Sequence, residues 1–178
     1  MSPELEHIRC EVEGLTLGWS ESDWHRALPG KWTSAQILEH LRLTFIATSK
    51  GILGVMEIGR PLGSKPTLPD RLRTFWVAKL GLMPSGRTAP KQPVPGDGFE
   101  DNTLRRFYDG LVAMDATLAD AERRFGVSVK LLDHPVLGPL SAKEWREFHR
   151  THARHHLKQM AKRTRLGTPR PRDREYSH

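Results

Sequence analysis

The C-terminal part of the chain carries a group of histidines whose spacing suits a metal ion. His152 and His156 are four residues apart, so on an α-helix they lie one turn apart on one face. Two imidazoles in this arrangement can converge on one divalent ion, as in helical HExxH zinc sites. His149 lies near the same face, whereas His155 points about 100° away from His156. The spacing therefore predicts that His152 and His156 are metal ligands.

His40 is the predicted third ligand, because a catalytic metal usually has three protein ligands and one open position. The helical face of His40 also carries mostly small and apolar residues, such as Ile37 and Ala47, which indicates an inward orientation. A buried histidine needs a partner for its ring nitrogens, and a shared ion would supply one. Imidazole binds several divalent metals; Zn is the first choice, and Ni could occupy the site in recombinant protein.

Other interpretations of these histidines stay open at the level of sequence. A single buried histidine is more often hydrogen-bonded than bound to a metal, and several histidines on a basic helix can form an exposed face. Gln159, three residues after His156, could supply an outer hydrogen bond to a ligand. Arg42 and Arg60 could contact an anionic substrate group, although arginine is more commonly exposed.

Periodic apolar segments predict an all-α fold that positions these residues. We expect a four-helix bundle with a short extra helix at about 68–82 and a long Pro/Gly-rich loop at 84–98 between the second and third long helices. Capping residues mark two helix starts, Thr33 or Ser34 and later Ser141 with Glu144. The expected long helices cover about 3–15, 34–58, 100–125 and 141–164. No convincing alternating strand pattern is present.

Length, charge and cysteine content narrow the class of protein. The 178 residues suit one domain, expected at 1–166, followed by a basic flexible tail at 167–178. Most of the net charge of +7 lies from Lys158 onward, where seven basic residues accompany two acidic ones. Without interleaved aromatic residues we do not expect nucleic-acid binding. One cysteine, no secretory signal and no membrane span predict a cytoplasmic protein.

Two segments resemble motifs of the DinB/YfiT-like metalloenzyme superfamily. HARHHLKQ, residues 152–159, is similar to its HxxHHxxQ signature, and KWTSAQILEHL, residues 31–41, resembles the motif that carries its first metal histidine. Residues 134–160 are similar to a branch defined only as a domain of unknown function, with the pattern His-Pro-x-x-Gly, Ser, Glu-Trp and then the histidine helix. The resemblance implies a four-helix bundle with His40, His152 and His156 as ligands.

The resemblance leaves the reaction open. Members elsewhere in the superfamily are S-transferases or isomerases that use low-molecular-weight thiols, or are hydrolases. A metal ion could activate either a water or a thiol, so we expect an enzyme acting on a small-molecule substrate by one of these routes. His134 could act as an acid–base group, or it could be a turn residue fixed by Pro135.

Two further classes of function remain alternatives. The chain could be a non-catalytic metal-binding or degenerate bundle that serves as an interaction module, or a basic nucleic-acid binder acting through its tail. Because bundles of this type often pair, a homodimer is an alternative to a monomer.

Overall fold

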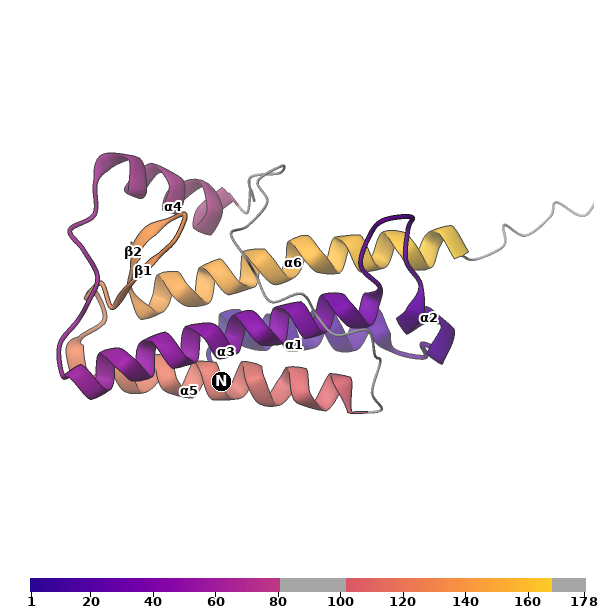
Figure 1. Ribbon diagram of the computed structural model, residues 1–178, viewed down its shortest axis with the longest axis horizontal. Coiled ribbons are helices and arrows are strands. Elements are labelled where there is room, and N and C mark those ends of the chain that lie inside the picture. Colours follow the sequence, from indigo (N-terminus) through magenta and orange to yellow (C-terminus); the bar gives the residue numbers. More distant parts are fainter. Residues whose placement is uncertain (81–101, 168–178) are drawn as a thin grey trace, which may run out of the picture.

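Four long helices run along a common direction and form a bundle (Figure 1). The structure is a computed structural model, which describes residues 1–80 and 102–167. The expected all-α bundle is confirmed. Its long helices are α1 (Pro3–Thr16), α3 (Ser34–Ile58), α5 (Thr103–Phe125) and α6 (Ala142–Gly167). The expected loop at 84–98 and most of the expected basic tail lie outside the described residues.

The capping signals of the sequence mark the starts of the two helices that carry the histidines. At α3, the Thr33 side chain accepts a hydrogen bond from the backbone N–H of Gln36 (3.1 Å), and the Gln36 side chain accepts one from the N–H of Thr33 (2.9 Å). At α6, the Glu144 carboxylate accepts a hydrogen bond from the backbone N–H of Ser141 (2.7 Å). These reciprocal bonds satisfy N–H groups that the first turn leaves free.

The core lies between the apolar faces of the long helices. On α3 and α5, the aromatic rings of Phe45 and Phe107 are fully buried and their centroids are 5.4 Å apart. Full burial of side chains of this size stabilises the fold by roughly 1.5–3 kcal/mol each. Within the described residues, no helix combines the length and the apolar character that a membrane crossing requires.

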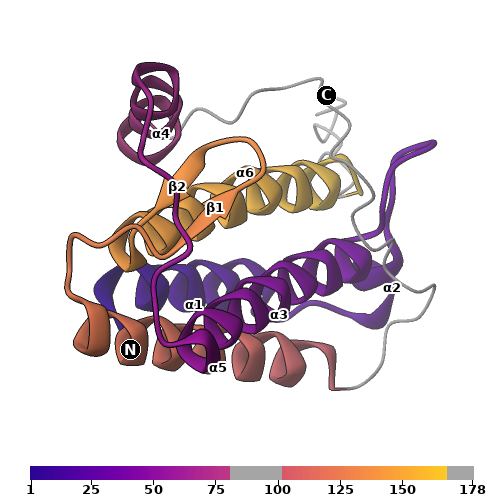
Figure 2. The same ribbon diagram turned by 60° about the vertical axis from the view of Figure 1, so that its left-hand side comes forward.

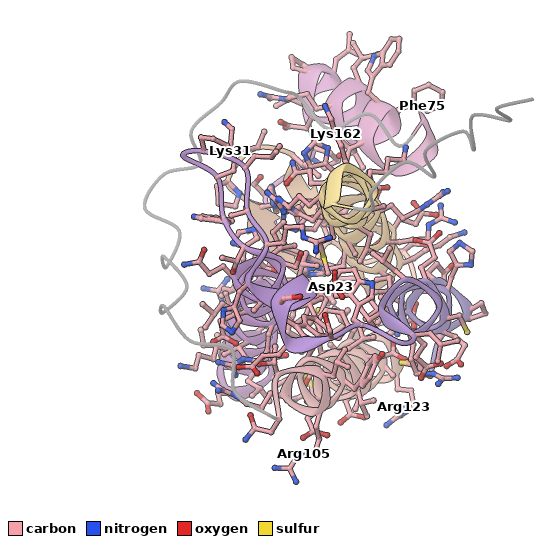
Figure 3. All side chains as sticks on the ribbon, turned by 90° about the vertical axis from the view of Figure 1, so that its right-hand side faces the viewer. Asp23, Lys31, Phe75, Arg105, Arg123 and Lys162 are labelled. Atoms are coloured by element: carbon pink, nitrogen blue, oxygen red, sulfur yellow. The ribbon has the colours of Figure 1, made fainter. Side chains whose placement is uncertain are left out.

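A short helix and a short two-stranded hairpin were not expected from the sequence. Helix α2 (Glu21–His25) has a capping box between Ser20 and Asp23, and it lies across one end of the bundle, where Asp23 is labelled (Figure 3). Strands β1 (Leu132–His134) and β2 (Gly138–Leu140) form an antiparallel hairpin with Leu132 opposite Leu140. Strands of three residues are too short for alternation to be recognised.

Helix α4 (Leu68–Leu80) lies outside the bundle, over the hairpin and the start of α6 (Figures 1 and 2). Two side-chain hydrogen bonds hold it there. Thr74 donates to the carbonyl of Leu137 (3.3 Å), and Thr151 of α6 donates to the carbonyl of Val77 (3.1 Å). The expected short helix at 68–82 is thus present in the described residues up to Leu80.

Candidate metal centre

The structure brings His40 of α3 together with His152 and His156 of α6, as the sequence predicted. His40 and His152 are 2% and 5% exposed, and His156 is half-buried. The Nε2 atom of His152 lies 3.4 Å from Nε2 of His40 and 3.1 Å from Nε2 of His156. One ring nitrogen from each of the three residues falls within 4.8 Å of the others. In the described part of the chain, this is the one group of potential ligands with such a geometry.

The separations between the ring nitrogens fit coordination of a common ion. Zinc–imidazole bonds of about 2.0–2.1 Å at tetrahedral angles place ligand nitrogens about 3.3 Å apart. The two shortest separations, 3.4 and 3.1 Å, lie on either side of this value. Because no carboxylate or thiolate belongs to the group in the described residues, an ion held here would keep most of its positive charge.

The three imidazoles are neutral, which is the form that binds metals. Burial lowers the pKa of His40 to about 4. Burial and then the neighbouring His40 lower the pKa of His156 to about 4. Burial, followed by His156 and His40, holds the pKa of His152 well below its usual range. Each ring therefore offers a lone pair at neutral pH.

Hydrogen bonds alone cannot satisfy the converging nitrogens. Nδ1 of His156 donates to Oε1 of Gln159 (3.2 Å), so its Nε2 carries a lone pair that faces His152. A single N–H on His152 can be directed at only one of its two neighbours. A cation at the common point would accept lone pairs from all three rings, so the donor set fits a divalent metal.

Gln159 fixes the orientation of one ligand. Besides accepting from His156, its amide Nε2 donates to Nε2 of His155 (3.0 Å), which places His155 outside the converging group. The Nδ1 atoms of His40 and His152 lack a hydrogen-bond partner among the described residues. Of the three candidate ligands, His156 is thus the one whose tautomer is set by an outer hydrogen bond.

Aromatic side chains flank two of the rings. Trp32, in the connection before α3, lies with its ring centroid 4.9 Å from that of His40. Phe148 is stacked on His152 at 5.5 Å with an interplanar angle of 19°. Seen from the end of the bundle, the connection that carries Lys31 and the last turns of α6 near Lys162 lie on the same side (Figure 3). One ligand ring from each of α3 and α6 thus has an aromatic side chain beside it.

His149 is beside the centre but has a different partner. It is fully buried, and its Nε2 forms a hydrogen bond of 2.9 Å with Oγ1 of Thr48 on α3. Burial and then the nearby His134 lower its pKa to about 3. Trp145 is stacked against it at 6.0 Å. His149 thus links α6 to α3 as a neutral core residue.

His134 is the last residue of β1, where the hairpin turn begins. Its Nδ1 accepts hydrogen bonds from the backbone N–H groups of Val136 (3.1 Å) and Leu137 (3.2 Å). The ring packs against Phe148 with centroids 4.4 Å apart, and Gly138 provides the positive φ of 77° that ends the turn. These contacts favour the turn role; the acid–base role stays a prediction.

The polar residues considered for substrate contact lie elsewhere or are already paired. Arg42 forms an ion pair with Glu39 (2.6 Å), and Arg60 is exposed. A cleft of about 550 Å³ lies between α4, the hairpin and the start of α6, with Arg71, Lys130 and Glu144 among its lining residues. None of the three converging histidines lines it.

Sequence reasoning missed one charged residue of this region. Arg163 was grouped with the basic end of the chain, but it is only 5% exposed. Its spacing of seven residues from His156 and eleven from His152 places it on their face of α6, and this periodicity is the signal that could have identified it.

Comparisons with known proteins identify a family but no characterised relative. The family model described as "Protein of unknown function (DUF1569)" matches residues 4–163. No curated protein and no solved structure matched the chain.

Proposed function

Because the chain belongs to the DUF1569 family, for which no function is defined, we propose its activity from the site itself: a divalent-metal-dependent enzyme acting on a small molecule. The observation that carries the proposal is the convergence of Nε2 atoms from His40, His152 and His156. Three neutral imidazoles with no carboxylate among them are a donor set that holds a divalent ion and keeps it electrophilic.

The resemblance to the DinB/YfiT-like superfamily supports the same proposal. Its two motifs fall on the two helices that contribute the ligands, His40 on α3 and the pair His152 and His156 on α6. The glutamine of the HxxHHxxQ pattern is Gln159, which accepts a hydrogen bond from His156. Membership of that superfamily is therefore part of the proposal, with Zn as the first candidate metal and Ni as the second.

When bound, the ion would supply a Lewis acid that lowers the pKa of a coordinated water or thiol. The protein's part is to present three lone pairs and to limit the access of water. Trp32 and Phe148 flank the ligands, and a low-dielectric wall strengthens electrostatic interactions inside it. Both hydrolysis and transfer to a low-molecular-weight thiol use such an arrangement.

A non-catalytic interaction module is the second candidate, and one observation favours it. Helix α4 exposes two large aromatic side chains, Phe75 and Trp76, each about half accessible, and Phe75 lies at the edge of the molecule farthest from α5 (Figure 3). Exposed apolar residues that gather on one helix are typical of protein contact surfaces.

Elemental analysis of tag-free protein tests the metal proposal. We expect about one equivalent of divalent metal per chain, as for a three-histidine site. His156→Ala should lower the occupancy sharply, whereas the matched change His155→Ala should leave it unchanged. Protein that contains almost no metal and gains none on addition of Zn or Ni would contradict the proposal, as would equal effects of the two substitutions.

Turnover assays separate the two reaction classes. A generic electrophile should be consumed by the metal-loaded protein only when a low-molecular-weight thiol is present if the reaction is thiol transfer, and an ester should be cleaved without thiol if it is hydrolysis. His40→Ala serves as the ligand-deficient control. Loaded protein that is inactive in both assays would favour the interaction module.

A further inference from the structure

Arg163 is a buried cation next to the candidate metal centre. It lies on α6 and is 5% exposed. On an ideal helix it falls about 20° from His152 and about 20° from His156, between the two. Side chains of a helix lean toward its N-terminus, so the long side chain of Arg163 extends back toward His156.

The positive charge of Arg163 acts on one of the candidate ligands. Burial is the largest cause of the lowered pKa of His156, and the positive charge of Arg163 is a further one. Because Arg163 also lies on the face of α6 that carries His152 and His156, its guanidinium is on the side of the centre where these rings lie.

Two nitrogens of the guanidinium are unpaired among the described residues. Its Nε and Nη1 atoms are buried and have no hydrogen-bond partner in the described part of the chain. Arg146, on the same helix and 7% exposed, shows the usual arrangement. Its Nε donates to Asp115 (2.9 Å) and its Nη1 donates to Glu122 (2.9 Å).

A buried charge without a partner is unfavourable, and folded proteins rarely leave such donors unpaired. The unpaired Nε–H and Nη1–H groups point to different sides of the guanidinium, and each can donate a charge-assisted hydrogen bond to an oxygen of a carboxylate or phosphate. The other arginines considered for this role do not offer these donors, since Arg42 is paired with Glu39 and Arg60 is exposed.

We propose that Arg163 is the anion-binding residue of the centre and that the substrate is a small molecule with a carboxylate or phosphate group, which Arg163 holds beside His156. The role of that molecule as substrate rests on the proposed function, whereas anion binding by Arg163 does not require a metal.

Titration of full-length protein with inorganic phosphate and, separately, with acetate tests this inference. The side-chain Nε–H signal of Arg163, assigned by its loss in Arg163→Gln, is followed by NMR. We expect it to shift saturably, and the anion that binds more tightly identifies the preferred group. The signal of Arg146 serves as an internal control and should not move. The titration is done on protein as purified and again after metal removal, so that binding to an ion is separated from binding to arginine.

Three variants define the expected effects on anion binding. Arg163→Gln should weaken binding by about tenfold or more, the value of a lost charge-assisted hydrogen bond. Lys162→Gln removes the same charge from an exposed neighbour and should bind as the wild type does. Arg163→Lys keeps the charge without the planar set of N–H donors and should be intermediate.

Three results would overturn the inference: no saturable shift of the Arg163 signal in the wild type, unchanged binding in Arg163→Gln, or an equal loss in Lys162→Gln. Arg163→Lys also removes the Nε–H signal and can assign it, so the first result stands even if the Gln variant does not fold. The Arg163→Gln protein should still bind its metal. Failure of the metal proposal and failure of the anion-binding proposal can therefore be told apart.

Discussion

The Nε2 atoms of His40 and His152 lie 3.4 Å apart, although 112 residues separate them in the sequence. The contact joins α3 to α6 in the interior of the bundle. A single N–H on His152 cannot form hydrogen bonds with both His40 and His156. Because a shared ion would resolve this arrangement, metal content and folding stability should be linked.

Addition of Zn to metal-free protein should raise its melting temperature. An ion that binds only the folded state at a hundredfold excess over its Kd contributes about 2.7 kcal/mol, which corresponds to roughly 5–10 °C for a chain of this length. His40→Ala should abolish the rise, because it removes the ligand that α3 supplies. His7→Ala, a change on the exposed face of α1, should retain it. A rise of equal size in both variants would show that the ion binds elsewhere.

Acid should destabilise the metal-free fold, and His149 should account for part of the effect. Its pKa is about 3 in the folded protein and about 6.5 when unfolded. The unfolded chain therefore takes up the proton first, and stability is lost as the pH falls from about 6.5 toward 3 at up to ~1.4 kcal/mol per pH unit. His149→Gln should reduce this slope in urea titrations measured from pH 7 to pH 4. An unchanged slope would contradict the prediction.

Thr48→Val should weaken the bundle. The substitution keeps the shape of the side chain but removes the hydroxyl that pairs with Nε2 of His149 at 2.9 Å. A buried ring nitrogen without its partner costs about 1–3 kcal/mol. Thr44→Val is the matched control, because the Thr44 hydroxyl donates only to a carbonyl within its own helix. Chemical denaturation should show a clearly larger loss for Thr48→Val; equal losses would mean that the link to His149 contributes little.

His134→Asn separates the two roles considered for that residue. The Asn side-chain oxygen can accept the backbone N–H groups of Val136 and Leu137, which His134 binds through Nδ1, but it cannot transfer a proton. If His134 is a turn residue, the variant should keep its stability and, once a substrate is known, nearly all of its kcat. A stable variant that has lost its kcat and the corresponding pH dependence would establish the acid–base role instead.

The sequence by itself predicted the parts of this protein that depend on local geometry. A helical period of 3.6 residues placed His152 and His156 on one face without reference to the rest of the chain. The hydrogen bonds of the capping boxes span three residues, so Thr33 and Ser141 marked the starts of α3 and α6. The inward position of His40 also followed from its small and apolar neighbours on α3.

Only the tertiary structure decided how these local pieces meet. The distance from His40 to His152 depends on how α3 packs against α6, which no local pattern specifies. The hairpin at 132–140 was missed because three-residue strands carry too little periodicity. Arg163 looked like one of several basic residues near the end of the chain. Its burial and its unpaired nitrogens follow from the packing around α6, because desolvation depends on what surrounds a charge and not on the charge alone.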